Sequence, residues 1–266
     1  MKSSRWFPCR PRPALLALGL IGLTGLAGCT PSAPKHGTEY VLAVEPAEAG
    51  SAIAALPADA LERTGKALKR RLELAGWQAA FEIVPPNLLR IRVAEHLTGS
   101  VTNLPKLLTR PGRLEFRLVH PDSEKLLAAG TVPNEYETLK EVISRPGGIS
   151  ETRPHLVAKQ PLPGLTGHVQ KAFPSQDASP GHMVINFQFD ADGARAFGDV
   201  TTQNLGRQLA ILLDGVLYSA PIIRSPITGG SAQISGSFKL AEARELAALL
   251  ETALDWRIRL VEERQF

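Results

Sequence analysis

The stretch NLGRQLAILLDGVLYSAPII, residues 204–223, constrains the fold more than any other part of the sequence. Two apolar runs flank Asp214-Gly215. The tight two-residue turn of a β-hairpin needs positive φ at both central positions, and Asp-Gly is a preferred pair there. The stretch therefore predicts a hairpin rather than the rim of an active site.

The residues upstream of position 120 predict a ferredoxin-like arrangement. Strand-like runs at 39–46 and 113–120 flank a helical pattern at 57–77, two strands within 77–96 and a short helix within 98–112. Leu61, Leu68 and Leu72 give the first helix its apolar face, and Gly76 ends it. The charged run at 69–71 is interpreted as a solvated face of that helix. The order from residue 40 to 119 is thus βαββαβ, as in ferredoxin-like folds.

The rest of the chain predicts a second α+β unit. Residues 120–180 are rich in Pro and Gly, with 135–144 as the one plausible helix, and are interpreted as an insertion or a domain junction. Beyond them a half-buried strand at 182–189 leads through Asp190-Ala191-Asp192-Gly193 into a helix. The hairpin follows, and then come a strand at 231–238, an amphipathic helix at 240–254 and a last strand at 256–263. The expected fold class is α+β.

The first 29 residues have the pattern of a bacterial lipoprotein signal. Basic residues precede an apolar run from Ala14 to Ala27, which is short for a membrane span. Leu26-Ala27-Gly28-Cys29 resembles a lipobox, so we expect cleavage before Cys29 and lipidation of its thiol. An ordinary secretory signal with an incidental cysteine is the alternative. Thr30 after Cys29 favours the outer membrane over the inner in bacteria that sort lipoproteins by that position.

Charge and chemistry narrow the possible functions. The chain has 30 basic and 26 acidic residues, and the first 28 residues hold four of the basic ones, so the expected mature chain has no excess of charge to favour nucleic acid. The sequence lacks G-x-S-x-G, H-E-x-x-H and a phosphate-binding loop. Residues 190–193 lack calcium-loop spacing and are better explained as a turn with Asp192 near the helix N-cap. We expect no catalytic residue, no metal, no small-molecule substrate and no cofactor except the lipid on Cys29.

Several segments resemble the first periplasmic domain, P1, of the export protein family SecD. They are GRLEFRLV at 112–119, the stretch 201–254 and LVEER at 260–264, although Ala94-Glu95-His96 replaces the usual L-P-G. The residues that match the family's motifs are Asn204, Gly206, Asp214, Gly215, Ser219, Pro221, Gly229 and Gly236. We expect these residues to set the geometry of the scaffold, and Leu217 and Tyr218 to present a surface to a partner.

The resemblance implies a base and a mobile head. The expected divisions are a signal at 1–28, lipidated Cys29 with a tether to 38, a ferredoxin-like base at 39–119, an insert at 120–180 that is part of the head, and the head at 181–266. The last strand, near 258–262, either stays with the head or returns to the base. SecD continues into transmembrane helices, whereas no second apolar span follows here, so we expect no proton-driven motor in this polypeptide.

Two functions remain open on the sequence. The first is a lipid-anchored module that faces the periplasm, binds extended or unfolded polypeptide and assists export, with Sec translocon components or exported preproteins as partners. The second is a structural or interaction lipoprotein of the cell envelope that kept the fold and not the export role.

Overall fold

The computed structural model describes residues 36–46, 56–94, 103–144, 150–176 and 183–266. The predicted signal, the lipidation site Cys29 and the predicted tether up to residue 35 lie outside these residues. In the described ranges, no helix combines the length and the apolar composition that a membrane crossing needs.

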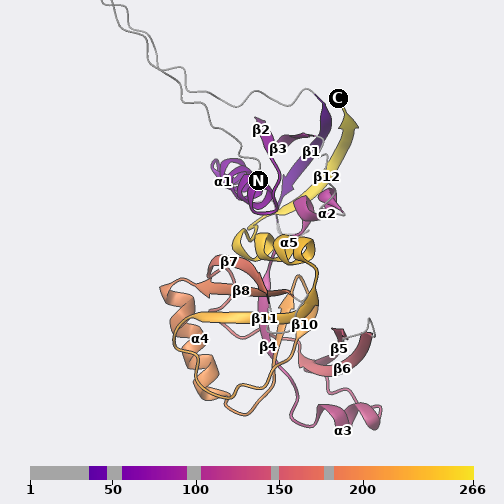
Figure 1. The fold of residues 1–266 in the computed structure, drawn as a ribbon, viewed down its shortest axis with the longest axis vertical. Helices are drawn as coiled ribbons and strands as arrows, with labels where there is room; N and C mark the ends of the chain where they lie inside the picture. The colour runs from indigo at the N-terminus through magenta and orange to yellow at the C-terminus, as the bar shows by residue number, and fades with distance from the viewer. Residues whose placement is uncertain (1–35, 47–55, 95–102, 145–149, 177–182) are drawn as a thin grey trace, which may run out of the picture. The chain divides into compact units, whose positions relative to one another are not determined.

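The first unit, which we call the base, is a four-stranded antiparallel sheet with two helices on one face (Figure 1). Its strand order is β12-β1-β3-β2, the order of a ferredoxin-like βαββαβ unit whose fourth strand is β12. Its elements are β1 (Gly37–Glu45), α1 (Ala60–Leu74), β2 (Ala79–Val84), β3 (Leu88–Ala94), α2 (Leu104–Thr109) and β12 (Arg257–Gln265).

The strand predicted to complete the base lies elsewhere. β4 (Leu114–Leu118) pairs antiparallel with β9 (Leu209–Leu213), and β12 takes the edge position beside β1. Both segments alternate apolar and charged residues, so periodicity could not choose between them. Phe116 of β4 is fully buried, with its ring centroid 5.2 Å from that of Phe197. This aromatic packing holds β4 in the second unit, which we call the head.

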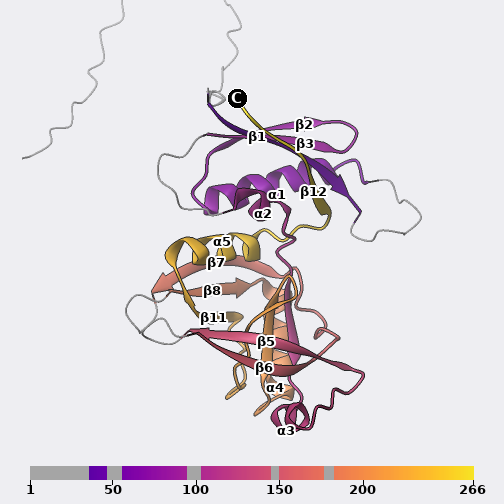
Figure 2. The same ribbon diagram turned by 90° about the vertical axis from the view of Figure 1, so that its right-hand side faces the viewer.

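The head is inserted between α2 and β12 of the base. It contains two three-stranded sheets, ordered β10-β9-β4 and β11-β8-β7, and a two-stranded ribbon, β5-β6. Its remaining elements are α3 (Ser123–Ala128), β5 (Tyr136–Ser144), β6 (Ser150–Ala158), β7 (Val169–Gln176), β8 (Met183–Phe189), α4 (Ala191–Gln203), β10 (Val216–Ser219), β11 (Ser231–Phe238) and α5 (Leu240–Glu251). Figure 2 shows α5 between α1 of the base and β7 of the head, and its residues contact both elements.

The helix predicted at 135–144 is wrong, because this segment forms β5. It pairs with β6 over its whole length, from Tyr136 opposite Ala158 to Ser144 opposite Ser150. Thr138, Val142 and Ile143 are β-branched, which favours a pleated strand once a partner is present. That partner follows in the sequence after further Pro and Gly, and no local periodicity announces it.

The turn before α4 leads into that helix with Asp192 near its N-cap, as expected, and the cap itself is Asp190. Asp190 is the N-cap, and its Oδ1 accepts hydrogen bonds from the backbone N–H groups of Asp192 at 3.1 Å and Gly193 at 2.8 Å. Such a cap satisfies donors that the first helical turn leaves unpaired. Asp192 lies two residues after the cap, in the first turn.

Candidate functional site

The hairpin that the sequence predicts is present and ends in a tight turn. β9 and β10 pair antiparallel, and Asp214 and Gly215 between them have φ of 52° and 77°. Positive φ at both positions matches the twist that antiparallel strands need. The turn brings the carboxylate of Asp214 to the end of the hairpin.

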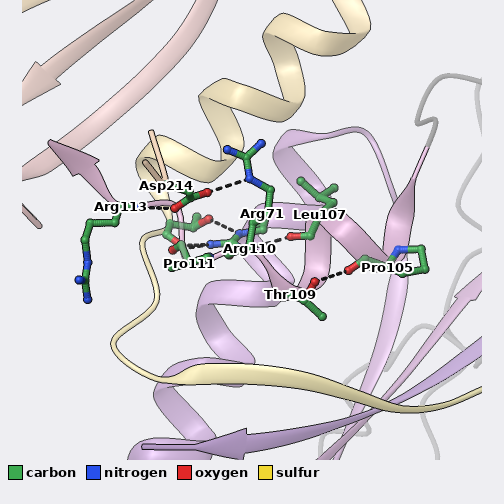
Figure 3. Close-up of polar contacts among 9 residues, drawn as sticks. Arg71, Pro105, Leu107, Thr109, Arg110, Pro111, Arg113 and Asp214 are labelled. Atoms are coloured by element: carbon green, nitrogen blue, oxygen red, sulfur yellow. Dashed lines mark hydrogen bonds and ion pairs between the residues drawn. The ribbon is translucent and has the colours of Figure 1, made fainter. Parts of the chain in front are cut away.

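Asp214 attaches this turn to residues 110–113, which we call the connector because they link α2 of the base to β4 of the head (Figure 3). Arg110 Nε donates to Asp214 Oδ2 at 2.8 Å, and the Arg113 N–H donates to Oδ1 at 2.8 Å. The Asp214 N–H in turn donates to the carbonyl oxygen of Arg113 at 2.9 Å. The turn therefore fixes the position of the connector.

A buried arginine holds the other side of the connector. Arg71 of α1 has no exposed surface, and its guanidinium donates to the carbonyl oxygens of Leu107, Arg110, Pro111 and Thr252 and to Thr252 Oγ1. Burial lowers the pKa of Arg71 to about 9, while the charge of Asp214 acts in the opposite direction and that of Arg110 lowers it further. The side chain thus joins α1, the connector and the end of α5.

Gly112 lets the connector pass close to α5. Its φ is +77°, and a Cβ at this position would lie 2.3 Å from the carbonyl oxygen of Leu249. The carbonyl of Pro111 accepts a hydrogen bond from the Leu254 N–H at 2.8 Å, so the connector also contacts the chain that leads into β12. Only glycine satisfies both the backbone conformation and the spacing.

Glu251, at the end of α5, makes a second polar link between base and head. Arg70 of α1 donates to its Oε1 from Nε at 3.0 Å and from Nη2 at 2.8 Å, and the Ala172 N–H of β7 donates to Oε2 at 2.9 Å. One carboxylate therefore contacts one helix of the base and one strand of the head.

A cavity of about 110 Å³ lies beside this link. This volume is smaller than the ~300 Å³ at which small-molecule sites begin, so the cavity fits water better than a substrate. Its lining residues are Gly112, Leu114, Gly167, Val169, Leu250, Glu251 and Ala253. In the described part of the chain, no three His, Cys, Asp or Glu side chains gather where they could hold a metal ion.

The expectation that Leu217 presents a surface is wrong. Leu217 is 5% exposed and packs with Val157 of β6 and Leu212 of β9 in a small second core. The β5-β6 ribbon covers this face of the hairpin. The sequence does not predict this cover, because it predicts a helix at 135–144, where β5 lies. Tyr218 is half-buried, with its ring centroid 6.0 Å from that of Phe238. The exposed apolar side chain of β10 is Val216, at 54%.

The remaining motif residues lie along the hairpin and β11 and shape the backbone. Asn204 ends α4, where its Nδ2 donates to the carbonyl of Val200 at 2.9 Å and its Oδ1 accepts from Arg207 at 2.9 Å. Gly206 has φ of +77°, and its N–H donates to the carbonyl of Ile223 at 2.9 Å. These contacts extend the pairing of the two hairpin arms beyond β9 and β10.

The other four motif residues serve backbone geometry and packing. The carbonyl of Pro221 accepts from the Leu209 N–H at 2.9 Å, and Ser219 is buried. A Cβ on Gly236 would lie 2.5 Å from the ring of Phe238, whereas Gly229 has open space around its Cα. These positions lie apart from the Asp214 contacts and form no common site with them.

Arg71, Arg110 and Glu251 were not predicted as site residues. The expectation that the run at 69–71 is a solvated face is wrong for Arg71, which is buried. Arg71 lies on the same helical face as Leu68 and Leu72, three and one residues away, and this spacing places it toward the interior. A charge at an apolar position was the signal that could have identified it.

A ferredoxin-like base with a head inserted before its last strand is the two-part arrangement that the resemblance to a P1 domain leads us to expect. The family model described as "SecDF, P1 head subdomain" matches residues 140–255, from within β5 to just beyond α5. The match thus falls on the head rather than the base.

Curated relatives of the chain are named protein translocase subunit SecD. That of Calditerrivibrio nitroreducens is 33% identical over 165 residues, which cover 60% of this chain and 32% of the relative. That of Rhodobacter capsulatus is 32% identical over 207 residues, which cover 77% of this chain and 35% of the relative. The chain therefore spans about a third of the length of these relatives.

Solved structures show the same fold. A crystal structure of SecDF in a super-membrane-facing form matches 89% of this chain and 32% of that chain, with 25% identity and a TM-score of 0.62. A structure of the "membrane component SecDF that enhances protein export" matches 84% of this chain and 98% of that chain, with 28% identity and a TM-score of 0.57. The chain is therefore SecD P1-like.

Proposed function

We propose that this chain assists protein export outside the cytoplasmic membrane by binding extended or unfolded polypeptide with its head. The observation that carries the proposal is the P1-like pairing of base and head in a chain whose relatives are named translocase subunits. The partners would be Sec translocon components or exported preproteins. The proposal includes no catalytic step and no proton-driven motor of its own.

The proposed attachment is a lipid on Cys29, with the folded part in the periplasm. It rests on the sequence of residues 26–29 and on the short polar stretch that follows before β1 begins at Gly37. A tether of this length keeps the base close to the membrane that holds the lipid. The choice of outer over inner membrane rests on Thr30 alone.

The junction supports a role that needs an oriented head. Arg71, Arg110 with Asp214, and Glu251 with Arg70 attach the head to α1 and the connector at three separate points. These contacts are directional, and leaving a buried partner unpaired is costly, so they favour one orientation of the head on the base.

The test is crosslinking in cells with a photoreactive residue at exposed Val216 or exposed Val142 of the lipidated protein. Recovery of translocon subunits, or of many secreted proteins in transit, is the expected result. A matched protein with the photoreactive residue at buried Leu217 gives the background, because this side chain contacts only its own chain's core. A single abundant envelope protein, or no partner above background, would contradict the proposal and favour the structural lipoprotein.

A further inference from the structure

β11 is a terminal strand of its sheet and pairs with β8 on one side only. The Phe189 N–H donates to the carbonyl of Gly230 at 2.8 Å, and the register continues through Ala232 opposite Phe187. Hydrogen-bonded and non-hydrogen-bonded pairs alternate in an antiparallel ladder. The backbone groups of Ser231 and Gln233 therefore point away from β8, and within the described residues no backbone hydrogen bond joins them to another strand.

This edge lacks the features that commonly protect a sheet edge. Residues 231–238 contain no charge and no proline. In contrast, β12, β4 and β2 carry charged residues, and β7 has Lys171 and Pro174 and an N–H satisfied by Glu251. Of the other terminal strands in the described three- and four-stranded sheets, β10 alone shares the lack of charge and proline, and it has four residues. An unprotected longer edge is a template for an added strand.

The exposed side chains of this edge lie within residues 231–235. Two elements from outside its sheet, β10 and β5, also contact β11. The ring of Tyr218 from β10 lies 6.0 Å from that of Phe238, so β10 packs against the end of β11. Toward the start of β11, Ser231, Gln233 and Ser235 are exposed, whereas Ile234 is buried in the core. The open length suits about four or five residues of extended chain.

The side chains around this edge indicate what would occupy it. Ser231 and Gln233 lie opposite Gln188 and Asn186 of β8, so the outer face presents amides and hydroxyls without charge. On the other face an added strand would lie beside Ala232 and Ile234, next to the core. Backbone pairing would supply affinity, and alternate side chains would supply selectivity.

We propose that the free edge of β11 binds a short extended segment of uncharged polypeptide as an added strand. This inference rests on the proposed function, since it names the part of the head that would bind the polypeptide. The occupant is a segment in which small polar and apolar residues alternate. Its polar side chains would lie beside the hydroxyls and amides of one face, and its apolar side chains beside Ala232 and Ile234 on the other.

The test uses the full chain with Cys29→Ser, which removes the proposed lipidation site. Its ligand is a fluorescein-labelled ten-residue peptide of alternating Ser and Val with capped ends. Fluorescence anisotropy measures binding. Gln233→Pro removes an outward N–H that β8 does not use and should weaken binding at least tenfold. Gln233→Ala keeps that N–H and should change binding less than threefold. The same peptide N-methylated at alternate residues should not bind.

A second variant guards against misfolding by proline. Ser235→Lys adds a charge to the edge at an exposed position and should also weaken binding, with a melting temperature close to that of the starting protein. Equal binding by all variants, binding of the N-methylated peptide, or pairing of β11 with a second copy of the chain, seen by ultracentrifugation, would each overturn the inference.

The two proposals fail in different ways. If Gln233→Pro still binds a reduced, unfolded secreted protein as strongly as the starting protein does, the edge is not the site and the proposed function stands. If the starting protein binds neither the peptide nor the unfolded protein, the proposed function fails as well.

Discussion

Arg110 and Asp214 are 104 residues apart in the sequence, and Arg110 Nε lies 2.8 Å from Asp214 Oδ2. The pair joins the start of the connector to the turn of the head's hairpin. Both side chains are largely buried, so water weakens their attraction less than at an open surface. The turn that first suggested a hairpin is therefore also part of the base-to-head junction.

Asp214→Asn should lower the free energy of unfolding by about 1–2 kcal/mol. Asn tolerates the positive φ of this position, so the change tests the charge and not the turn. An amide can still accept from Arg113, but its NH₂ group cannot accept from Arg110. Urea unfolding measures the effect. The control is Asp192→Asn, which removes an exposed pair with Arg195 and should cost less than about 0.5 kcal/mol.

Arg71→Lys should destabilise the protein by about 2–4 kcal/mol, although it keeps the charge. A single ammonium cannot satisfy the carbonyl oxygens of Leu107, Pro111 and Thr252 that the guanidinium reaches from two nitrogens. Arg63→Lys, on the exposed side of the same helix, is the matched control for urea unfolding. Equal losses for the two variants would show that the buried contacts of Arg71 are weak.

The sequence predicted the elements of both units well where the pattern was local. The turn residues announced the hairpin, and Leu246 and Leu250 lie on the predicted apolar face of α5. The membership of strands in sheets was harder, since β4 and β12 have similar alternation and only the aromatic contacts of Phe116 decide between them. Nothing in a local pattern marks which sheet receives a strand.

The candidate site was harder to predict than the fold. The turn identifies Asp214, but its partners lie in two other predicted elements: Arg110 near the end of the short helix and Arg113 at the start of the following strand. Leu217 was expected at the surface because the layer above it, β6, could not be foreseen. Pairing between distant segments determines both the partners of Asp214 and the burial of Leu217. The periodicity of a local sequence predicts neither.

Gly112→Ala should cost more than about 3 kcal/mol, because it combines a left-handed backbone with a steric overlap. Gly206→Ala separates the two effects. Gly206 has the same φ of +77° but no atom within 4 Å of the added Cβ, so it should cost about 1–2 kcal/mol. Thermal or urea unfolding of both variants measures the difference. Similar losses would mean that the connector can move away from Leu249.

The environment of Glu39 predicts how the free energy of unfolding changes as the pH falls. Its side chain is 1% exposed, and it accepts from Arg92 Nε at 2.6 Å and Arg264 Nε at 2.8 Å. Burial raises the pKa of Glu39, but the hydrogen bonds and charges of Arg92 and Arg264 outweigh it, so the pKa lies below 4.5. A lowered carboxyl pKa gives stability that is present above pH 4.5 and is lost as pH falls through the folded-state value.

The measurement is urea unfolding of the starting protein and of Glu39→Gln from pH 7 down to pH 3. The starting protein should be the more stable at pH 7, and the difference should shrink as the pH falls below about 4.5. Glu82→Gln, which removes an exposed partner of Arg90, should have a small effect at pH 7. A constant difference across the range would show that Glu39 does not stabilise the fold through its charge.

Leu217→Ala should destabilise the protein by about 2–4 kcal/mol, because it leaves a cavity in the small core between the hairpin and the β5-β6 ribbon. Val216→Ala, one residue away on the exposed face, should cost less than about 1 kcal/mol. Chemical unfolding measures both. The contrast tests whether the ribbon covers the hairpin. If the opposite face were buried, Val216→Ala would give the larger loss in free energy of unfolding and Leu217→Ala the smaller. Equal and small losses would show that the ribbon packs too loosely to bury Leu217, and that this side chain could contact a partner.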